Sequence, residues 1–394
     1  MKQPSPRSSS SPRPWNNPQV RAVAFQIIAL GCVIWFAYSL FQNTTANMAA
    51  RGISTGFSFL SAEAGFGIVM SLVKYESTMS YGRTFVVGLL NTLLVAGLGI
   101  VLATVLGFIM GVARLSSNWL VAKVALVYIE VFRNIPLLLQ IFFWYFAVLR
   151  NLPGPRNSIE LGGIGFLSNR GIALAWPQFQ PGAIWMGAAL VLAIVLVITL
   201  VRWVKRRQAR TGKQFPTLRV ALALLIGLPV LAYYAAGMPV VWDIPELRGF
   251  NIRGGVTIIP ELGALLLALT LYTASFIAEI VRSGILAISK GQTEASAALG
   301  LSPRKTLRLV VIPQAMRVII PPLTSQYLNL TKNSSLATAI GYPDLVNVFM
   351  GTTLNQTGQA VEIVAMTMGV YLLISLIISV LMNIYNRAVA LKER

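Results

Sequence analysis

The chain contains no histidine, and only one cysteine occurs among its 394 residues. The absence of imidazole excludes histidine metal sites, histidine acid–base catalysis and histidine proton relays. A single cysteine excludes an intrachain disulfide and a thiolate metal cluster. The sequence also lacks the pattern G-x-x-x-x-G-K-[ST], which excludes ATP binding through a phosphate-binding loop of that type. We therefore expect neither an enzyme nor a protein with a metal or cofactor of its own.

Charged residues are scarce as well, at 11% of the chain, whereas a soluble domain carries about 25%. Hydrophobic residues reach 56%, which indicates that most of the chain lies where water is absent. The 32 basic residues outnumber the 12 acidic ones and give a net charge of +20. In a soluble protein this excess would suggest nucleic acid. Here the basic residues lie between long apolar runs, which favours membrane lipid and argues against nucleic acid as a partner.

Long apolar runs dominate the sequence, and a helix that spans a membrane needs about 20 such residues. Eight stretches predict an all-α, polytopic membrane protein: 22–41, 84–113, 119–149, 183–201, 219–237, 259–281, 315–340 and 361–385. Cys32 ends a lipobox-like string, but apolar residues continue after it, which favours a helix over a cleaved lipoprotein signal. Arg133 and Pro136 interrupt the third stretch, so its first part is expected to form an elbow at the cytoplasmic surface.

The distribution of basic residues predicts the orientation. With the N-terminus placed inside, 23 of the 32 basic residues fall on the cytoplasmic side and 8 on the other, while Lys332 lies within a span. Positive charge is enriched on the cytoplasmic side of membrane proteins. Eight spans also return the chain to its starting side, so we expect both termini in the cytoplasm.

Residues 289–318 form the most informative segment between two spans. Their pattern predicts a short helix from Gln292 to Leu299, with Glu294 in the first turn, where a negative charge suits the helix dipole. Ala295 and Ala298 leave a thin helix surface that another protein can approach closely. Gly300 is placed to end the helix in a left-handed conformation.

A second short helix is expected after this glycine. Ser302 occupies an N-cap position and Pro303 the first helical position. Arg304 and the basic residues after it make this helix positive, and Pro313 is expected to stop or bend it. A short, capped helix pair can sit in a groove of a cytoplasmic motor protein and transmit force as a rigid body. The alternative is an ordinary loop helix between two spans.

This segment resembles the EAA loop of membrane subunits in type I ATP-binding-cassette (ABC) importers, which has the pattern E-A-A, three residues, G, and later an apolar-x-P ending. Glu294, Ala295, Gly300 and Ile312-Pro313 match, and Ser296 replaces the usual second alanine. Further fragments are similar to the polar amino-acid permease branch: Gly291-Gln292, Pro313 to Arg317, Pro321-Pro322, Ala278 to Arg282 and Phe132 to Gln140.

The resemblance implies the transmembrane fold of a type I importer in residues 84–386. Within it, residues 150–258 form an insertion of periplasmic loops, two extra helices and a basic cytoplasmic connector. Residues 1–21 are then a disordered cytoplasmic tail, 22–83 a first transmembrane helix with a periplasmic loop, and 387–394 a cytoplasmic C-terminal tail.

This enlarged layout resembles the larger subunit of general L-amino-acid importers of Gram-negative bacteria. The resemblance implies an inner-membrane permease that translocates L-amino acids. Its implied partners are separate ABC ATPase subunits, which bind the ATP, a periplasmic amino-acid-binding protein and a second, different permease subunit.

Polar residues inside the spans are candidates for function, because an ionisable group there is costly. Glu279 in the sixth span and Lys332 in the seventh can pair with each other or receive the ammonium and carboxylate of an amino acid. Alternatively, Glu279 pairs with Arg282 on its own helix. A polar run in the seventh span predicts a substrate pathway, or helix contacts at a break in the helix: Asn329, Lys332, Asn333, Ser334 and Ser335.

Other polar and small residues are interpreted mainly as packing. Gly107 and Gly111 predict a close helix contact in the second span. Asn91 and Thr92 face either the pathway or a neighbouring helix. Two other classes of protein remain as alternatives. An ion-gradient-driven secondary transporter or channel for small polar solutes predicts two related halves with broken helices, which the sequence lacks. A membrane scaffold or membrane enzyme has no visible chemistry to support it.

Overall fold

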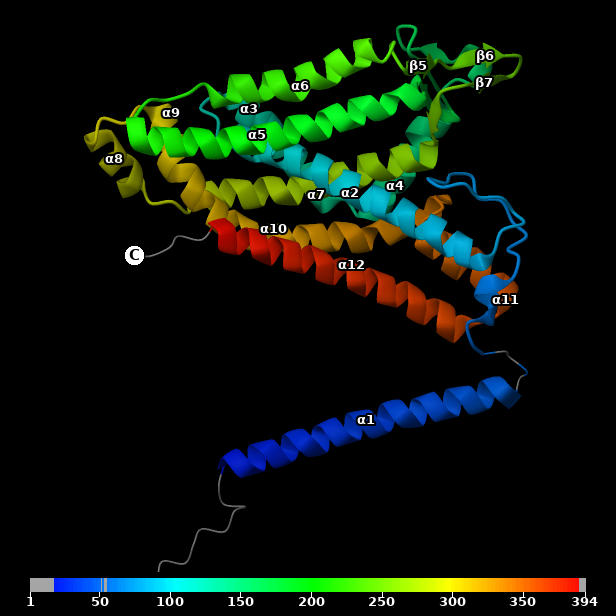
Figure 1. The fold of residues 1–394 in the computed structure, drawn as a ribbon. Coiled ribbons are helices and arrows are strands. Elements are labelled where there is room, and N and C mark those ends of the chain that lie inside the picture. The colour runs from blue at the N-terminus through cyan, green and yellow to red at the C-terminus, as the bar shows by residue number, and fades with distance from the viewer. Residues whose placement is uncertain (1–17, 51, 53–54, 390–394) are drawn as a thin grey trace, which may run out of the picture.

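The computed structural model describes residues 18–50, 52 and 55–389 and is mostly helical (Figure 1). Seven of its helices are long and apolar enough to cross a membrane, and one bent helix pair meets the same test when its two parts are counted as one span. These elements correspond to the eight predicted stretches, which confirms the polytopic helical architecture. The predicted N-terminal tail up to residue 17 and the C-terminal residues 390–394 lie outside the described residues.

The first helix, α1 (Pro18–Ala50), is longer than predicted at both ends. Residues 18–21 belong to this helix rather than to a tail, and residues 42–50 continue it into the predicted loop. No proline or glycine interrupts residues 42–50, so the helix persists beyond its apolar stretch. In Figure 1, α1 lies apart from the other helices, and its side chains are almost all exposed.

Four helices form the centre of the molecule: α2 (Tyr81–Ala113), α7 (Pro260–Leu286), α10 (Ile312–Asn333) and α12 (Ala360–Val389). Helix α2 packs along α7. A Cβ atom added at Gly107 would lie 2.6 Å from the Cβ of Ile277, and one at Gly111 would lie 2.7 Å from the carbonyl oxygen of Ala278. The predicted close contact at these two glycines is therefore confirmed.

The third predicted stretch is a sharply bent helix pair. Helix α3 (Trp119–Asn134) and the segment from α4 (Leu137–Phe142) to residue 151 meet at an angle of 105°. Pro136 has no backbone N–H and keeps Ile135 extended, so the helix cannot continue through this point. The buried Gln140 amide donates to the carbonyl oxygens of Phe132 at 3.0 Å and Ile135 at 2.9 Å, and this satisfies backbone groups that the break leaves free.

The described chain also contains short strands, which the all-α prediction omitted. The sheet β1-β2-β3-β8 is antiparallel, and β4-β5 and β6-β7 form two further pairs. The strands are β1 (Ile159–Glu160), β2 (Gly165–Ser168), β3 (Gly171–Leu174), β4 (Trp176–Phe179), β5 (Val240–Asp243), β6 (Glu246–Arg248), β7 (Asn251–Arg253) and β8 (Val256–Ile258). Pairing between these strands satisfies backbone N–H and C=O groups of residues 159–179 and 240–258, which would otherwise depend on water for hydrogen bonds.

The two helices between β4 and β5 form a hairpin. Helices α5 (Ile184–Thr211) and α6 (Thr217–Ala235) pack on each other. Among their described side chains, only Ala193 and Val204 are buried. The hairpin is therefore peripheral to the core.

Short helical segments complete the structure. Three of them are π-helical: η3 (Phe143–Val148), η7 (Leu307–Val311) and η9 (Val346–Thr353). Five are 3-10 helices: η2 (Ser58–Ser61), η4 (Leu149–Asn151), η5 (Pro155–Asn157), η6 (Pro181–Ala183) and η8 (Ser334–Ile340). Three are short α-helices: α8 (Lys290–Ala298), α9 (Pro303–Thr306) and α11 (Leu354–Thr357).

Candidate functional site

The predicted coupling segment begins with helix α8 (Lys290–Ala298), two residues earlier than expected. Ser289 takes the N-cap position, so Glu294 falls beyond the first turn. The expectation that Glu294 stabilises the first turn of this helix is therefore wrong. The helix starts earlier because Ser289 is extended and the residues after it are compatible with a helix.

The end of α8 matches the prediction for Gly300. This residue has φ of +72°, and its N–H donates to the carbonyl oxygen of Ala297 at 2.9 Å. The N–H of Leu301 donates to the carbonyl oxygen of Ser296 at 3.1 Å. This pair of hydrogen bonds is the Schellman motif, in which a left-handed residue closes the helix. Gly300 therefore gives α8 a defined end.

The surface of α8 is almost entirely uncovered by the rest of the described chain. Glu294, Ala295 and Ala298 are exposed, whereas Ser296 is buried and its hydroxyl donates to the carbonyl oxygen of Gln292 at 2.7 Å. Leu299 is 80% exposed. The described chain therefore leaves this helix surface free of contacts.

The second half of the segment differs in part from the prediction. Ser302 has the extended backbone of an N-cap, and Pro303 is the first residue of α9, although the Ser302 side chain forms no capping hydrogen bond. Arg304 is exposed at the helix surface. The chain then passes through η7 directly into α10, so Pro313 does not stop the helix. Pro313 cannot donate a backbone hydrogen bond, and the wider π-helical turn before it accommodates that loss.

Glu279 and Lys332 do not lie together. The Glu279 carboxylate accepts two hydrogen bonds from the Arg282 guanidinium, at 2.6 and 3.0 Å. This confirms the predicted alternative of a salt bridge on one helix. Glu279 lies near the end of α7 that leads to α8, whereas Lys332 lies at the far end of α10. Gly284 of α7 packs against Ile319 of α10. Glu279 lies five residues and Lys332 thirteen residues beyond this contact, so the two positions differ by roughly 12 Å along the helix axes at 1.5 Å per residue.

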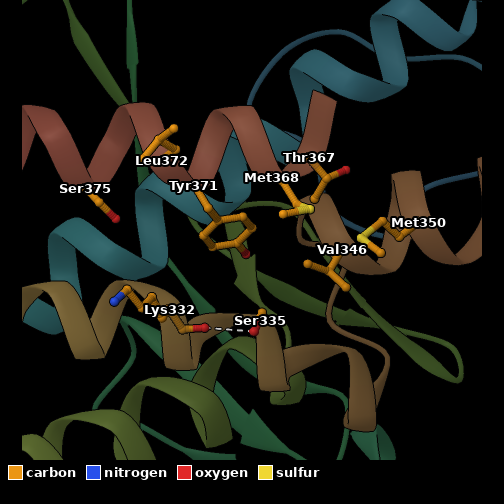
Figure 2. A pocket seen from close by; sticks show the side chains of 9 residues that line it. All are labelled: Lys332, Ser335, Val346, Met350, Thr367, Met368, Tyr371, Leu372 and Ser375. Atoms are coloured by element: carbon orange, nitrogen blue, oxygen red, sulfur yellow. Dashed lines mark hydrogen bonds between the residues drawn. The ribbon is translucent and has the colours of Figure 1, made fainter. Parts of the chain in front are cut away.

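Lys332 instead lines an open pocket of about 490 Å³ beside α12. Figure 2 shows Lys332 and Ser335 on one wall and residues of α12 on the opposite wall. Val346 and Met350 of η9 form the end of the pocket. The Ser335 hydroxyl donates to the carbonyl oxygen of Lys332 at 2.7 Å. Asn329 does not line the pocket, but it is exposed and lies three residues before Lys332, on the same helix face.

The remaining residues of the polar run mark the predicted break in the helix. Helix α10 ends at Asn333, and η8 continues the chain as a 3-10 helix. Ser334 is buried, and its hydroxyl donates to the carbonyl oxygen of Thr331 at 2.7 Å. Asn333 is half-buried. Neither Asn333 nor Ser334 lines the pocket.

Asn91 and Thr92 fasten the segment after η8 to α2. The Asn91 amide donates to the carbonyl oxygens of Pro343 at 2.8 Å and Met70 at 2.9 Å. The N–H of Leu345 donates to the Thr92 hydroxyl at 3.0 Å. Both residues are fully buried, so they hold neighbouring segments and do not open onto the pocket.

Asp344 is a buried acidic residue beside the pocket that was not among the predicted residues. It is 1% exposed. Its Oδ1 accepts hydrogen bonds from the N–H of Asn347 at 2.8 Å and the hydroxyl of Thr338 at 3.4 Å. Its Oδ2 accepts one from the hydroxyl of Tyr371, a pocket residue, at 3.4 Å. Burial raises the pKa of the Asp344 carboxyl to about 7, against the lowering effect of the hydrogen bonds from Asn347 and Thr338.

Three polar residues of α12 at the pocket were also missed. Thr367, Tyr371 and Ser375 recur at every fourth position and line the pocket opposite Lys332. This spacing puts the three residues on one helix face, and it is visible in the sequence. Asp344 carried a weaker signal, because it is the one acidic residue between Glu294 and Glu362.

Comparison with known proteins agrees with this architecture. A family model described as binding-protein-dependent transport system inner membrane component matches residues 215–391. The chain is 59% identical to the amino-acid ABC transporter permease protein YhdX of Escherichia coli strain K12, over 96% of both chains. It is 52% identical to the general L-amino acid transport system permease protein AapQ of Rhizobium johnstonii, over 96% of this chain and 94% of that protein.

More distant relatives match over much of the chain. The glutamate/glutamine/aspartate/asparagine transport system permease protein BztB of Rhodobacter capsulatus is 43% identical over 95% of both chains. A solved amino acid ABC transporter chain shares 20% identity over 78% of this chain and 95% of its own, with a TM-score of 0.46. Binding-protein-dependent systems have a separate ATPase and a binding protein as partners. The chain therefore belongs to the amino-acid ABC transporter permeases, in the branch that includes AapQ and YhdX, as a non-catalytic inner-membrane subunit of an importer.

Proposed function

We propose that the chain translocates L-amino acids, delivered by a periplasmic binding protein, along the face of α10 that carries Asn329, Lys332 and Ser335. The observation that carries this proposal is an exposed lysine beside a pocket inside a membrane-spanning segment. Lipid cannot solvate an ammonium group at this depth without a large cost. An amino-acid carboxylate and an aqueous path are suitable partners for it.

The relatives support a broad substrate range. AapQ is named for general L-amino acid transport and BztB for four acidic and amide amino acids. A lysine ammonium binds the carboxylate that all amino acids share, and the hydroxyl groups of Thr367, Tyr371 and Ser375 accept varied polar side chains. This chemistry supports a general L-amino-acid substrate over a single one. Glu279 is assigned to the salt bridge with Arg282, near the end of α7 that leads to α8.

The coupling surface is proposed to be the exposed side of α8 and α9, formed by Glu294, Ala295, Ala298, Gly300, Ser302, Pro303 and Arg304. Its nine-residue helix is closed at the C-terminal end by Gly300 and is almost entirely uncovered, which suits a rigid element that docks into an ATPase. Figure 1 places α8 and α9 at the end of the bundle where α1 begins and α12 ends. With the excess of basic residues on that side, this supports cytoplasmic termini.

A second, different permease subunit is proposed to cover the pocket. The pocket is open, and the face of α10 beside it exposes Ser325, Asn329 and Lys332. A polar helix face in the membrane is stable when it meets a protein partner or water. Co-expression with candidate permeases and affinity purification tests this assignment. A complex containing two copies of this chain and no other permease would contradict it.

The pathway is tested by uptake into proteoliposomes that contain the full complex. Lys332→Gln removes a charged hydrogen bond of about 1.5–3 kcal/mol, so substrate affinity should fall about tenfold or more. Lys123→Gln removes the same charge from an exposed position on α3 and should leave uptake unchanged. Size-exclusion chromatography verifies that each complex remains assembled. Wild-type uptake by an assembled Lys332→Gln complex would place the pathway elsewhere.

A further inference from the structure

The end of the α5–α6 hairpin carries a dense positive charge that neither the coupling segment nor the pathway uses. Residues 202–219, the basic tip, contain seven basic residues and no acidic residue. The basic residues are Arg202, Lys205, Arg206, Arg207, Arg210, Lys213 and Arg219. None of the seven forms an ion pair with an acidic side chain in the part of the chain that the structure describes. This charge is therefore available to a partner outside the chain.

An aromatic cluster gives the basic tip a defined shape. The guanidinium of Arg207 lies 5.2 Å from the ring centre of Trp203 and 5.9 Å from that of Phe215. The two rings meet edge to face, with centres 5.8 Å apart. These contacts hold the start of the connector against the last turns of α5, because cation–π and aromatic contacts both favour this arrangement. Arg207 is half-buried, and the other six basic residues are exposed.

The basic tip lies where the apolar part of the hairpin ends. Trp203 is 51% exposed and Leu218 is 73% exposed, on either side of the charged connector. A tryptophan at the end of an apolar helix beside several basic residues is the pattern of a membrane interface. The hairpin packs mainly on itself, so the described core does not shield this surface from the surrounding lipid.

We propose that the basic tip is a binding site for the phosphate headgroups of anionic phospholipids, with Arg206, Arg207 and Arg210 at its centre. Clusters of four to eight basic residues next to a membrane helix attract anionic lipid, and each residue contributes to the attraction. Exposed Trp203 and Leu218 supply the apolar contact with the upper part of the acyl chains. Bound lipid then anchors a hairpin that has few contacts with the core.

The test uses Trp203 as a built-in reporter in nanodiscs that contain the full-length permease. Fluorescence quenching by brominated phosphatidylglycerol is compared with quenching by brominated phosphatidylcholine at equal mole fraction. Subtracting the fluorescence of the Trp203→Phe variant isolates the contribution of Trp203. The site predicts stronger quenching by the anionic lipid. Each basic residue removed should lower lipid association about fivefold, so Arg206→Gln/Arg207→Gln/Arg210→Gln should abolish the preference.

A matched triple variant controls for net charge. Arg304→Gln/Lys305→Gln/Arg308→Gln removes three basic residues of α9 and η7, and α9 lies at the same end of the molecule as the basic tip (Figure 1). This variant should keep the preference for anionic lipid. Equal quenching by both lipids in the wild type would overturn the proposal, as would a preference that survives in the 206/207/210 variant. If adding the ATPase abolished the preference for anionic lipid, and the 206/207/210 variant bound the ATPase more weakly than the wild type, the basic tip would be assigned to the ATPase instead.

Discussion

Replacement of Gly300 by alanine tests whether the defined end of α8 transmits force. Gly300 has φ of +72°, and no other atom lies within 4 Å of the position that a Cβ would occupy. The substitution therefore introduces conformational strain without a clash. An L-residue in the left-handed region costs about 1–2 kcal/mol, which lowers the population of the correctly closed helix end about tenfold relative to frayed forms.

Gly358 supplies a matched control. It has φ of +70° and also has no atom within 4 Å of its Cβ position, but it lies after α11, away from α8. Gly358→Ala should therefore impose a similar conformational cost without affecting the coupling surface. Gly300→Asn should recover part of the function, because asparagine tolerates the left-handed region better than alanine.

The assay is the number of amino-acid molecules imported per ATP hydrolysed, in proteoliposomes with the ATPase and binding protein. Gly300→Ala should lower this ratio several-fold while ATPase activity persists, and Gly358→Ala should leave it near the wild-type value. An unchanged ratio in Gly300→Ala would show that the closed end of α8 does not transmit force. Equal losses in both alanine variants would also refute it, because the effect would then reflect general strain.

Two further predictions concern stability. Gly107→Ala would place a Cβ 2.6 Å from Ile277, whereas the same change at exposed Gly97 meets no atom within 4 Å. Thermal melting should show that Gly107→Ala lowers stability by about 1–3 kcal/mol and that Gly97→Ala raises it by up to about 1 kcal/mol. Equal melting temperatures for the two variants would contradict the tight contact between α2 and α7. The pKa of Asp344 is raised from 3.8 to about 7, so the folded state binds a proton that the unfolded state releases, and stability falls as pH rises through this window. Between pH 6 and pH 8 the wild type should lose about 1 kcal/mol relative to Asp344→Asn, and parallel pH curves for the two proteins would contradict the assignment.

Local rules were sufficient for the features that depend on short stretches of chain. The apolar runs predict the spans because a bilayer requires long uninterrupted apolar helices. Gly300 was predicted because a left-handed helix end has a strong residue preference. Gly107 and Gly111 were predicted because small residues four apart allow two helices to approach closely.

Features that depend on distant parts of the chain were not predictable in the same way. The pocket brings Lys332 of α10 together with Tyr371 of α12, and no local rule specifies which faces of two spans meet. Asp344 is buried because η8, η9 and α12 converge on it and α2 packs against its backbone. The short strands were missed because their pairing joins segments such as β3 and β8, which are separated by the whole α5–α6 hairpin.

The most direct measurement of the central claim is site-specific crosslinking between α8 and the ATPase. Cys32 is the sole cysteine, so Cys32→Ala provides a background without native thiols. Leu299→Cys is then compared with Leu218→Cys, because Leu299 is 80% exposed and Leu218 is 73% exposed. Leu299 follows α8 and Leu218 lies in the first turn of α6, and α8 and the start of α6 lie at the same end of the molecule (Figure 1). If α8 docks into the ATPase, position 299 should form a crosslink to the ATPase that changes with ATP, and position 218 should form none. Absence of an adduct at position 299, in a complex that still hydrolyses ATP and imports substrate, would show that α8 does not contact the ATPase.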